Sequence, residues 1–171
     1  MTLNSFQFNT TPGLRFGSGQ AKDSCKEISC KLGERILFIT DKGLMSLGLT
    51  NPTIKELKKN GSVEIFDNVE ADPSQKTLLN AIEVGKKIKA TGVIGFGGGS
   101  SMDVAKLTAL IVGSNENLEE AWGVANAKGP RLPLVLIPTT AGTGSEVTPI
   151  SIITVGEEEK KGVSSSLILP D

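Results

Sequence analysis

The feature that most limits the fold of this chain is a run of three glycines between an apolar strand and a helix. Residues 93–96 are predicted to form a buried strand, and Gly97, Gly98 and Gly99 follow at once. The next segment predicts a helix over residues 101–112. A buried strand that passes directly into a helix is typical of α/β folds with a parallel sheet.

The rest of the chain repeats this alternation. Residues 35–40 form a nearly continuous apolar run, as expected of a strand covered by helices on both faces. Further strands are predicted at residues 5–9, 14–16, 62–66, 134–137, 150–155 and 165–169, with a charged hairpin at 157–161 between the last two. Helices are predicted over residues 19–32, 51–60 and 72–91, from the cap residues Ser18, Asn51 and Asp72 and from prolines after the last two. We therefore expect one α/β domain over residues 1–171, with a mostly parallel sheet flanked by helices.

The composition excludes several classes of function. Lys and Arg number 18 against 19 Asp and Glu, whereas a nucleic-acid-binding protein would carry a basic excess. The 38% hydrophobic and 22% charged content is typical of a soluble globular protein. No apolar run approaches the roughly 18 residues of a membrane span, and no secretory signal begins the chain. We therefore expect a cytoplasmic protein that binds neither nucleic acid nor membrane.

The chain contains no histidine. This excludes Ser-His-Asp and Cys-His catalysis, imidazole metal ligands and the usual proton shuttle near neutral pH. Cys25 and Cys30 have no second pair and no histidine to complete a metal site, so we expect two structural thiols in a helix.

The glycine run is suited to bind phosphate. Glycine has no Cβ, so backbone N–H groups can approach a ligand closely. The following helix N-terminus adds unpaired N–H donors and a partial positive charge. Because position 100 is serine, the segment matches neither the P-loop nor the standard Rossmann fingerprint. The alternative is a tight strand-to-helix turn in which Ser100 merely caps the helix.

Two further features also follow predicted strands. A loop rich in glycine and hydroxyl groups spans residues 138–148, and Asp41 comes directly after the strand at 35–40. Ligands of open α/β sheets bind outside the carboxyl ends of strands, so two such loops could hold one extended dinucleotide and Asp41 could accept hydrogen bonds from its adenosine ribose. The alternatives are a surface loop for 138–148 and a helix N-cap for Asp41.

These three features, in this order, resemble the iron-containing (group III) alcohol dehydrogenases. The resemblance covers the whole chain and rests on residues 11–19, 40–42, 97–106 and 138–148. Its most specific part is the pattern Gly-Gly-Gly-Ser-x-x-Asp-x-x-Lys from Gly97 to Lys106.

The resemblance implies a Rossmann-like domain that binds NAD(P), with NAD expected in preference to NADP. By similarity, Gly97, Gly98, Gly99 and Ser100 would hold the pyrophosphate. The other side of the cofactor would be lined by Thr139, Thr140, Thr143 and Ser145. Asp41 would lie at the adenosine ribose, and Lys160 or Lys161 would reach a ribose.

The resemblance also implies a second half that this chain lacks. In the family an all-helical C-terminal domain holds iron or zinc through one Asp and three His, and the substrate, a small alcohol or aldehyde, lies between the domains. Those ligands would lie beyond Asp171, and the chain stops directly after an apolar segment, which suggests a truncation. We expect this chain alone to be inactive. Family members commonly dimerise through this domain, and the sequence leaves open whether this chain is a monomer or a homodimer.

Two alternatives remain at this point. One is a stand-alone nucleotide-binding module without catalysis. The other is part of a glycerol dehydrogenase or dehydroquinate synthase, which share the Gly-Gly-Gly-Ser run, although Glu146-Val147-Thr148 looks more like the alcohol dehydrogenases.

Overall fold

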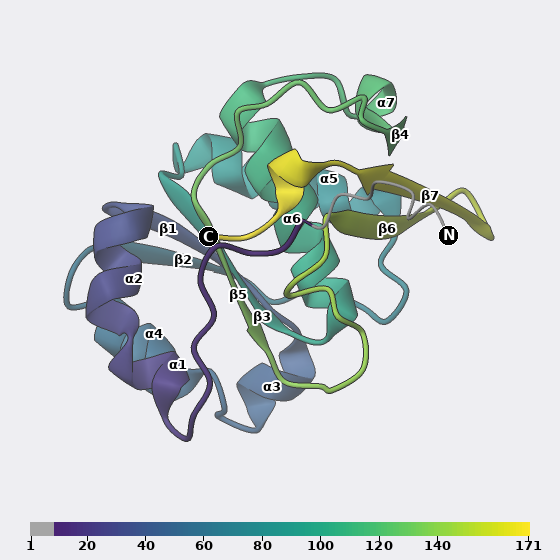
Figure 1. Ribbon diagram of the computed structural model, residues 1–171. Coiled ribbons are helices and arrows are strands. Elements are labelled where there is room, and N and C mark those ends of the chain that lie inside the picture. Colours follow the sequence, from purple (N-terminus) through teal and green to yellow (C-terminus); the bar gives the residue numbers. More distant parts are fainter. Residues whose placement is uncertain (1–8) are drawn as a thin grey trace, which may run out of the picture.

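A parallel four-stranded sheet forms the centre of the computed structural model, which describes residues 9–171 (Figure 1). The strand order is β2-β1-β3-β5, and the strands are Ser62–Phe66, Arg35–Ile39, Gly92–Gly97 and Leu134–Pro138. All three pairings are parallel, as the sequence predicts. The chain adds β2 on one side of β1 and then β3 and β5 on the other, so the direction of winding reverses between β1 and β3.

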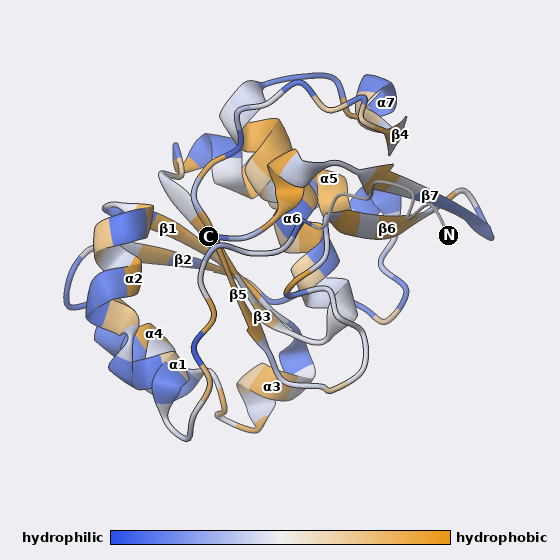
Figure 2. Cartoon of the chain, viewed as in Figure 1, coloured by the Kyte–Doolittle hydropathy of each residue, from blue (hydrophilic) through white to orange (hydrophobic). Residues whose placement is uncertain are grey.

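Helices cover both faces of this sheet (Figure 1). One face carries α5 (Gln75–Lys87) and α6 (Gly99–Ser114), and the other carries α2 (Cys25–Leu32) and α4 (Asn51–Leu57). Strand β1 serves both cores because successive side chains point to opposite faces. Its Leu37 and Ile39 belong to one buried cluster, whereas Ile36 and Phe38 belong to the other. In Figure 2, strands β1, β3 and β5 are largely orange, helices α2 and α4 carry blue, and α6 is largely orange because neighbouring elements cover it.

A smaller sheet packs against α6. It has the order β4-β7-β6, with strands Gly123–Val124, Glu159–Ser164 and Ile150–Val155. Strands β6 and β7 form an antiparallel hairpin. The remaining elements are short: α1 (Gln20–Asp23), α3 (Lys42–Ser46), α7 (Leu118–Ala121) and the 3-10 helix η1 (Ser166–Ile168).

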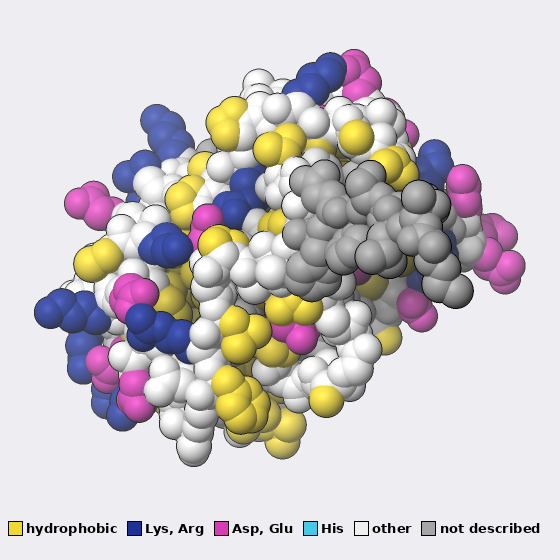
Figure 3. Space-filling view, viewed as in Figure 1, with side chains coloured by type: hydrophobic (Ala, Val, Ile, Leu, Met, Phe, Trp, Pro, Cys, Tyr) yellow, Lys and Arg dark blue, Asp and Glu magenta, His cyan; other side chains and the backbone are white. Residues whose placement is uncertain are grey.

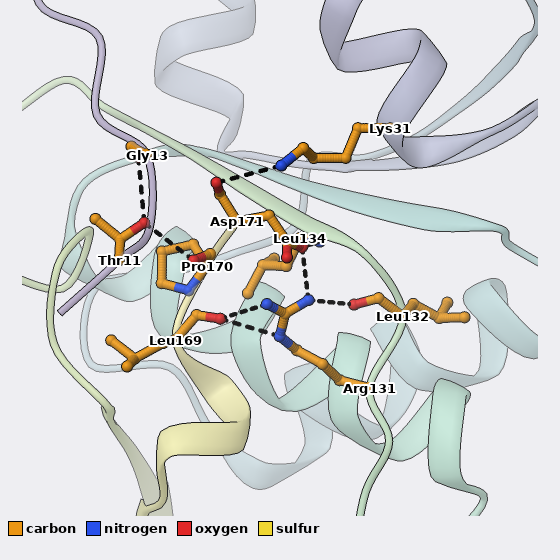
Figure 4. A network of polar contacts seen from close by, with 9 residues as sticks. All are labelled: Thr11, Gly13, Lys31, Arg131, Leu132, Leu134, Leu169, Pro170 and Asp171. Carbon is orange, nitrogen blue, oxygen red and sulfur yellow. Dashed lines mark hydrogen bonds and ion pairs between the residues drawn. The ribbon is translucent and has the colours of Figure 1, made fainter. Parts of the chain in front are cut away.

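The last residues of the chain are tied to the start of β5 (Figure 4). The Asp171 carboxylate accepts from the Arg131 guanidinium at 2.7 Å and from the Leu134 N–H at 2.8 Å, and the Asp171 N–H donates to the Leu134 carbonyl at 2.8 Å. Asp171 therefore satisfies both backbone polar groups of Leu134, as a neighbouring strand would. The Thr11 hydroxyl donates to the Pro170 carbonyl at 3.0 Å and brings the start of the described chain to the same place.

Several predicted helix boundaries are wrong. The helix predicted over 19–32 is two helices separated by Ser24, and Gly19 rather than Ser18 occupies the N-cap of α1 with φ of 80°. Asn51 is the first residue of α4 and not its cap. Asp72 is not a cap either, because α5 begins at Gln75 and its cap is Ser74, whose hydroxyl accepts from the Thr77 N–H. A local hydroxyl three residues ahead of a free N–H outcompetes the more distant Asp72.

The peripheral strands also differ from prediction. Residues 14–16 are exposed and form no strand, and the strand predicted at 5–9 lies, apart from Asn9, outside the described residues. The segment predicted as a strand at 165–169 is η1, which buries Ile168 completely without pairing. The predicted charged hairpin is shorter, because β7 already begins at Glu159. Both cysteines lie in α2, where Cys25 is buried but Cys30 is exposed, so only Cys25 is a packed thiol.

The described surface is mixed in charge. On the face shown in Figure 3, lysine and arginine side chains are interspersed with acidic ones. Within residues 9–171, every helix is too short or too polar to cross a membrane.

Candidate functional site

The three segments singled out in the sequence lie at the carboxyl ends of adjacent strands. Asp41 follows β1, Gly97–Gly99 end β3 and begin α6, and residues 139–145 follow β5. Because β1, β3 and β5 are neighbours and parallel, these ends meet at one edge of the sheet. The reversal of winding between β1 and β3 lies at the same place, where open α/β sheets form their ligand crevice.

The three glycines are not equivalent. Gly97 has φ of 153°, and a Cβ there would lie 2.7 Å from the Ser101 Oγ, so the fold itself requires glycine. Gly98 has φ of −77°, and its Cβ would meet only the Thr140 side chain, at 3.6 Å, which is ordinary contact. A Cβ on Gly99 would lie 3.1 Å from the Thr143 Cγ2. The fold leaves space at Gly98 that a side chain could enter, so this glycine keeps backbone open to a ligand.

The start of α6 carries no side-chain cap. Gly98 is the N-cap residue and Ser100 already lies in the first turn, so the interpretation of Ser100 as a cap is wrong. Among the described residues, the first N–H groups of this 16-residue helix therefore have no side-chain acceptor, and no capping group offsets the partial positive charge at its N-terminus.

The hydroxyl-rich loop contacts the glycine run. The Thr139 N–H donates to the Gly97 carbonyl at 2.9 Å and continues the pairing of β5 with β3. Thr139, Thr140 and Thr143 are exposed, whereas Ser145 is buried beneath them. The structure thus brings together the two loops that the sequence analysis assigned to opposite sides of one ligand.

Asp41 is the N-cap of α3. Its Oδ1 accepts from the Leu44 N–H at 2.9 Å, which confirms the capping interpretation. Capping uses one carboxylate oxygen and leaves Oδ2 to accept another hydrogen bond. The Leu44 side chain lies 3.3 Å from the position of a Cβ on Gly97, so the segment that Asp41 caps packs against the glycine run.

The Lys160 ammonium lies elsewhere. It donates to the Asp72 carboxylate at 2.7 Å and to the Thr154 hydroxyl at 2.8 Å. Asp72 is exposed and precedes α5, whereas Thr154 is half-buried in β6. The structure therefore does not bring Lys160 into contact with the three loops.

Helix α6 carries two charged residues, a half-buried Asp103 and a buried Lys106, for which the sequence alone predicts no role. Lys106 is completely buried on α6, and Asp103 lies one turn before it. Burial lowers the Lys106 pKa to about 8, although Asp103 and Glu146 act in the opposite direction. Burial also raises the pKa of Asp103, against the lowering effects of the Ile152 N–H, Lys106 and Ser145. The signal that could have found them is an Asp and a Lys at i and i+3 in a helix that is otherwise apolar on all sides.

The described residues do not form a site for divalent iron or zinc. Within residues 9–171, no three His, Cys, Asp or Glu side chains are grouped so that they could hold a metal ion. The whole sequence also has no histidine.

The sequence of this chain is similar to that of several known proteins. The family model for iron-containing alcohol dehydrogenase matches residues 11–171. A sulfoacetaldehyde reductase from Bilophila wadsworthia is 31% identical over 170 residues, which are 98% of this chain and 44% of that protein. A choline dehydrogenase from Bacillus subtilis is 38% identical over 163 residues, which are 93% of this chain and 40% of that protein.

Solved structures give the same result. A 1,3-propanediol oxidoreductase superposes with a TM-score of 0.91 at 28% identity, over 98% of this chain and 44% of its own. A sulfoacetaldehyde reductase from Bifidobacterium kashiwanohense, solved in complex with NAD+, superposes with a TM-score of 0.83 at 30% identity, over 100% of this chain and 45% of its own. The chain therefore spans less than half the length of these relatives.

Proposed function

Because this chain belongs to the iron-containing alcohol dehydrogenase family, we propose that it is the NAD-binding portion of an alcohol dehydrogenase. The observation that carries the proposal is the meeting of three loops at the carboxyl ends of β1, β3 and β5, beside the point where the sheet reverses its winding. The relative solved in complex with NAD+ supports a dinucleotide as the ligand. The family match favours this function over the glycerol dehydrogenase and dehydroquinate synthase alternatives.

In this proposal each loop holds one part of the dinucleotide. The pyrophosphate lies on the N–H groups from Gly97 to Ser100, where the positive end of α6 stabilises its negative charge. The hydroxyl groups of the second loop line the other side of the cofactor; they belong to Thr139, Thr140, Thr143 and Ser145. Asp41 accepts from the adenosine ribose through the oxygen that does not cap α3.

Bound NAD would supply the hydride chemistry, in which an alcohol carbon gives a hydride to the nicotinamide. The residues described here bind and orient the cofactor. No step is assigned to a metal, because the donors in residues 9–171 do not fit one. In this proposal, residues 1–171 are the nucleotide-binding domain of a longer enzyme. That whole enzyme would turn over an alcohol or aldehyde substrate and would form a homodimer.

Titration of the purified chain with NADH tests the proposal, with the variant Gly98→Val as its probe. The fold tolerates a Cβ at Gly98, but a valine would prevent close approach of a pyrophosphate to the backbone. We expect NADH affinity to fall by at least tenfold, or about 1.4 kcal/mol, with little change in the urea midpoint.

Gly17→Val is the matched control, because Gly17 lies in an exposed segment outside the three loops and its Cβ would meet only the flexible Gln20 side chain. It should bind NADH like the wild type. A folded Gly98→Val chain that binds NADH unchanged would show that the phosphate lies elsewhere.

A further inference from the structure

Lys106 connects the helix that follows the glycine run (Gly97–Gly99, below called the glycine loop) to the end of the hydroxyl-rich loop (residues 138–148, below called the hydroxyl loop). Its Nζ donates to the Thr148 and Ile150 carbonyls, each at 2.8 Å. Thr148 ends the hydroxyl loop and Ile150 begins β6, whereas Lys106 belongs to the helix that starts at the glycine run. One buried side chain therefore connects the elements that follow the two loops.

Asp103 reinforces the same connection. Its Oδ2 accepts from the Ile152 N–H at 3.0 Å, and its backbone carbonyl accepts from the Ser151 hydroxyl at 2.9 Å. With the two bonds of Lys106, four hydrogen bonds hold α6 against the start of β6. None of these atoms lies in the glycine run or among the threonines proposed to bind cofactor.

The charge on Lys106 matters because carboxylates flank it on both elements. Asp103 lies on α6 and Glu146 lies on the hydroxyl loop, and both act electrostatically on Lys106. Asp103 Oδ1 and Glu146 Oε2 are buried without a hydrogen-bond partner among the described residues. A protonated Lys106 offsets the negative charge of both carboxylates, so the loss of its charge would weaken the contact between the loop and α6.

Within residues 9–171, no other charged group faces Lys106 from the elements packed around it. Strands β3, β5 and β6 and the 3-10 helix η1 contain no charged residue, and Arg35 of β1 is exposed. The charged residues of α5 are exposed rather than turned toward α6.

We propose that Lys106 is a positioning residue that sets the separation of the two cofactor loops. The proposal rests on the function proposed above, because it concerns the loops that would hold the dinucleotide. Lys106 does not touch the cofactor; it fixes the hydroxyl loop at the distance from the glycine run at which one ligand reaches both.

The test is NADH binding by Lys106→Met, which keeps most of the length of the buried side chain and removes the charge and the donors. We expect affinity to fall about tenfold near pH 7. Lys86→Met is the matched control, because Lys86 lies on the exposed side of α5 and its ammonium donates to the Asn115 side chain. It should bind NADH like the wild type.

The pH profile separates positioning from a general loss of structure. Since the Lys106 pKa is about 8, wild-type NADH affinity should decline as pH rises from 7.5 to 9.5, whereas the affinity of Lys106→Met should stay level. NADH itself has no group that titrates in this range. If Lys106→Met does not fold, Lys106→Gln, which removes the charge but keeps a donor, takes its place. A level wild-type profile overturns the proposal in either case.

The other outcomes are distinguishable. A wild-type chain that binds no NADH refutes the proposed function and not the role of Lys106 alone. If the wild type binds, then Lys106→Met with affinity within twofold of wild type overturns the positioning role. A weakened Lys106→Met that keeps the wild-type pH decline also overturns it, because the decline would then come from another group.

Discussion

Gly97, Gly98 and Gly99 are consecutive in the sequence, but each is glycine for a different physical reason. Gly97 has a backbone conformation that other residues rarely adopt, and Gly99 lies against Thr143. Only Gly98 has ordinary backbone angles and space for a side chain. A function in ligand binding therefore explains Gly98 where packing does not.

Asp41 should control the choice between NAD and NADP. NADP carries a phosphate on the adenosine ribose, and two unit charges about 4 Å apart repel by roughly 4 kcal/mol at an effective dielectric near 20. Screening would leave about 1–3 kcal/mol, or about tenfold to hundredfold in affinity. We expect wild type to prefer NAD by this factor and Asp41→Gly to bind NADP more tightly, as measured by titration with both reduced cofactors.

The cap that Asp41 forms on α3 requires a second variant. Asp41→Asn keeps an acceptor for the Leu44 N–H and removes the charge, so it should relax the preference without loss of stability. A preference that is unchanged in both variants would mean that Asp41 only caps the helix.

Lys106 should make stability rise with pH just above neutrality. Burial lowers its pKa to about 8 from an ordinary value of 10.5. Above pH 8 the unfolded chain holds a proton that the native chain has released, so the free energy of unfolding increases with pH. Urea unfolding at pH 8 and 9 should show a gain of about 1 kcal/mol that Lys106→Met lacks.

The comparison stops at pH 9 because the Cys25 thiol has the opposite effect on the free energy of unfolding. Burial raises the pKa of the Cys25 thiol from 9.0 to about 11, so the unfolded chain releases this proton first and stability falls over that range. Equal slopes for wild type and Lys106→Met between pH 8 and 9 would contradict the assignment to Lys106.

At the scale of elements, helix α6 organises the molecule. It packs on the central sheet, on α5 and on β6, and it is apolar on nearly all sides. Its N-terminus lies at the glycine run, while the middle of the helix carries the Lys106 connection to β6. Contact on all sides explains why its buried charges need partners from another element.

The tie between β5 and the end of the chain should contribute measurably to stability. Burial raises the pKa of Asp171, but hydrogen bonds from Arg131 and the Leu134 N–H lower it by more, so the net shift is downward. Such a carboxylate stabilises the native state above its unfolded pKa, and the effect is lost as pH falls through the folded pKa. Asp171→Asn should cost about 1–2 kcal/mol in urea unfolding at pH 7, and the difference from wild type should shrink in acid.

Glu27→Gln is the control for this prediction. Arg15 and Glu27 also form an ion pair, but both side chains are more than half exposed, at 56% and 61%. Exposed pairs contribute little, so we expect a change within about 0.5 kcal/mol. Equal effects of Asp171→Asn and Glu27→Gln would show that the β5 tie has no special value.

At the scale of the whole molecule, the described residues join a parallel four-stranded sheet to a small three-stranded sheet, and they contain no group of side chains that could hold a metal ion. We expect purified 1–171 to show no alcohol oxidation above background, with or without added iron or zinc, because the sequence has no histidine. The measurement is NADH formation from a panel of primary alcohols, with a metal-free sample as reference. Turnover that depends on added metal would contradict this expectation.

The sequence by itself determined the parallel α/β sheet, because buried strands such as 35–40 and 93–96 are apolar throughout and the segments between them have helical caps and periods. It also determined the three loops and the family, because glycine runs and hydroxyl-rich turns at strand ends have a local chemical meaning. These features depend on residues close together in the chain, so pattern alone reveals them.

Only the tertiary structure decided which glycine faces open space, which oxygen of Asp41 caps α3 and where Lys106 finds its acceptors. The Thr148 and Ile150 carbonyls lie 42 and 44 residues beyond Lys106, and local propensity contains nothing about such a contact. The same reason explains why the strand predicted at 165–169 is wrong: this segment buries Ile168 against the core and does not pair with another strand. Contacts between distant segments, and the cost of burying a charge without them, are set only when the whole chain is folded.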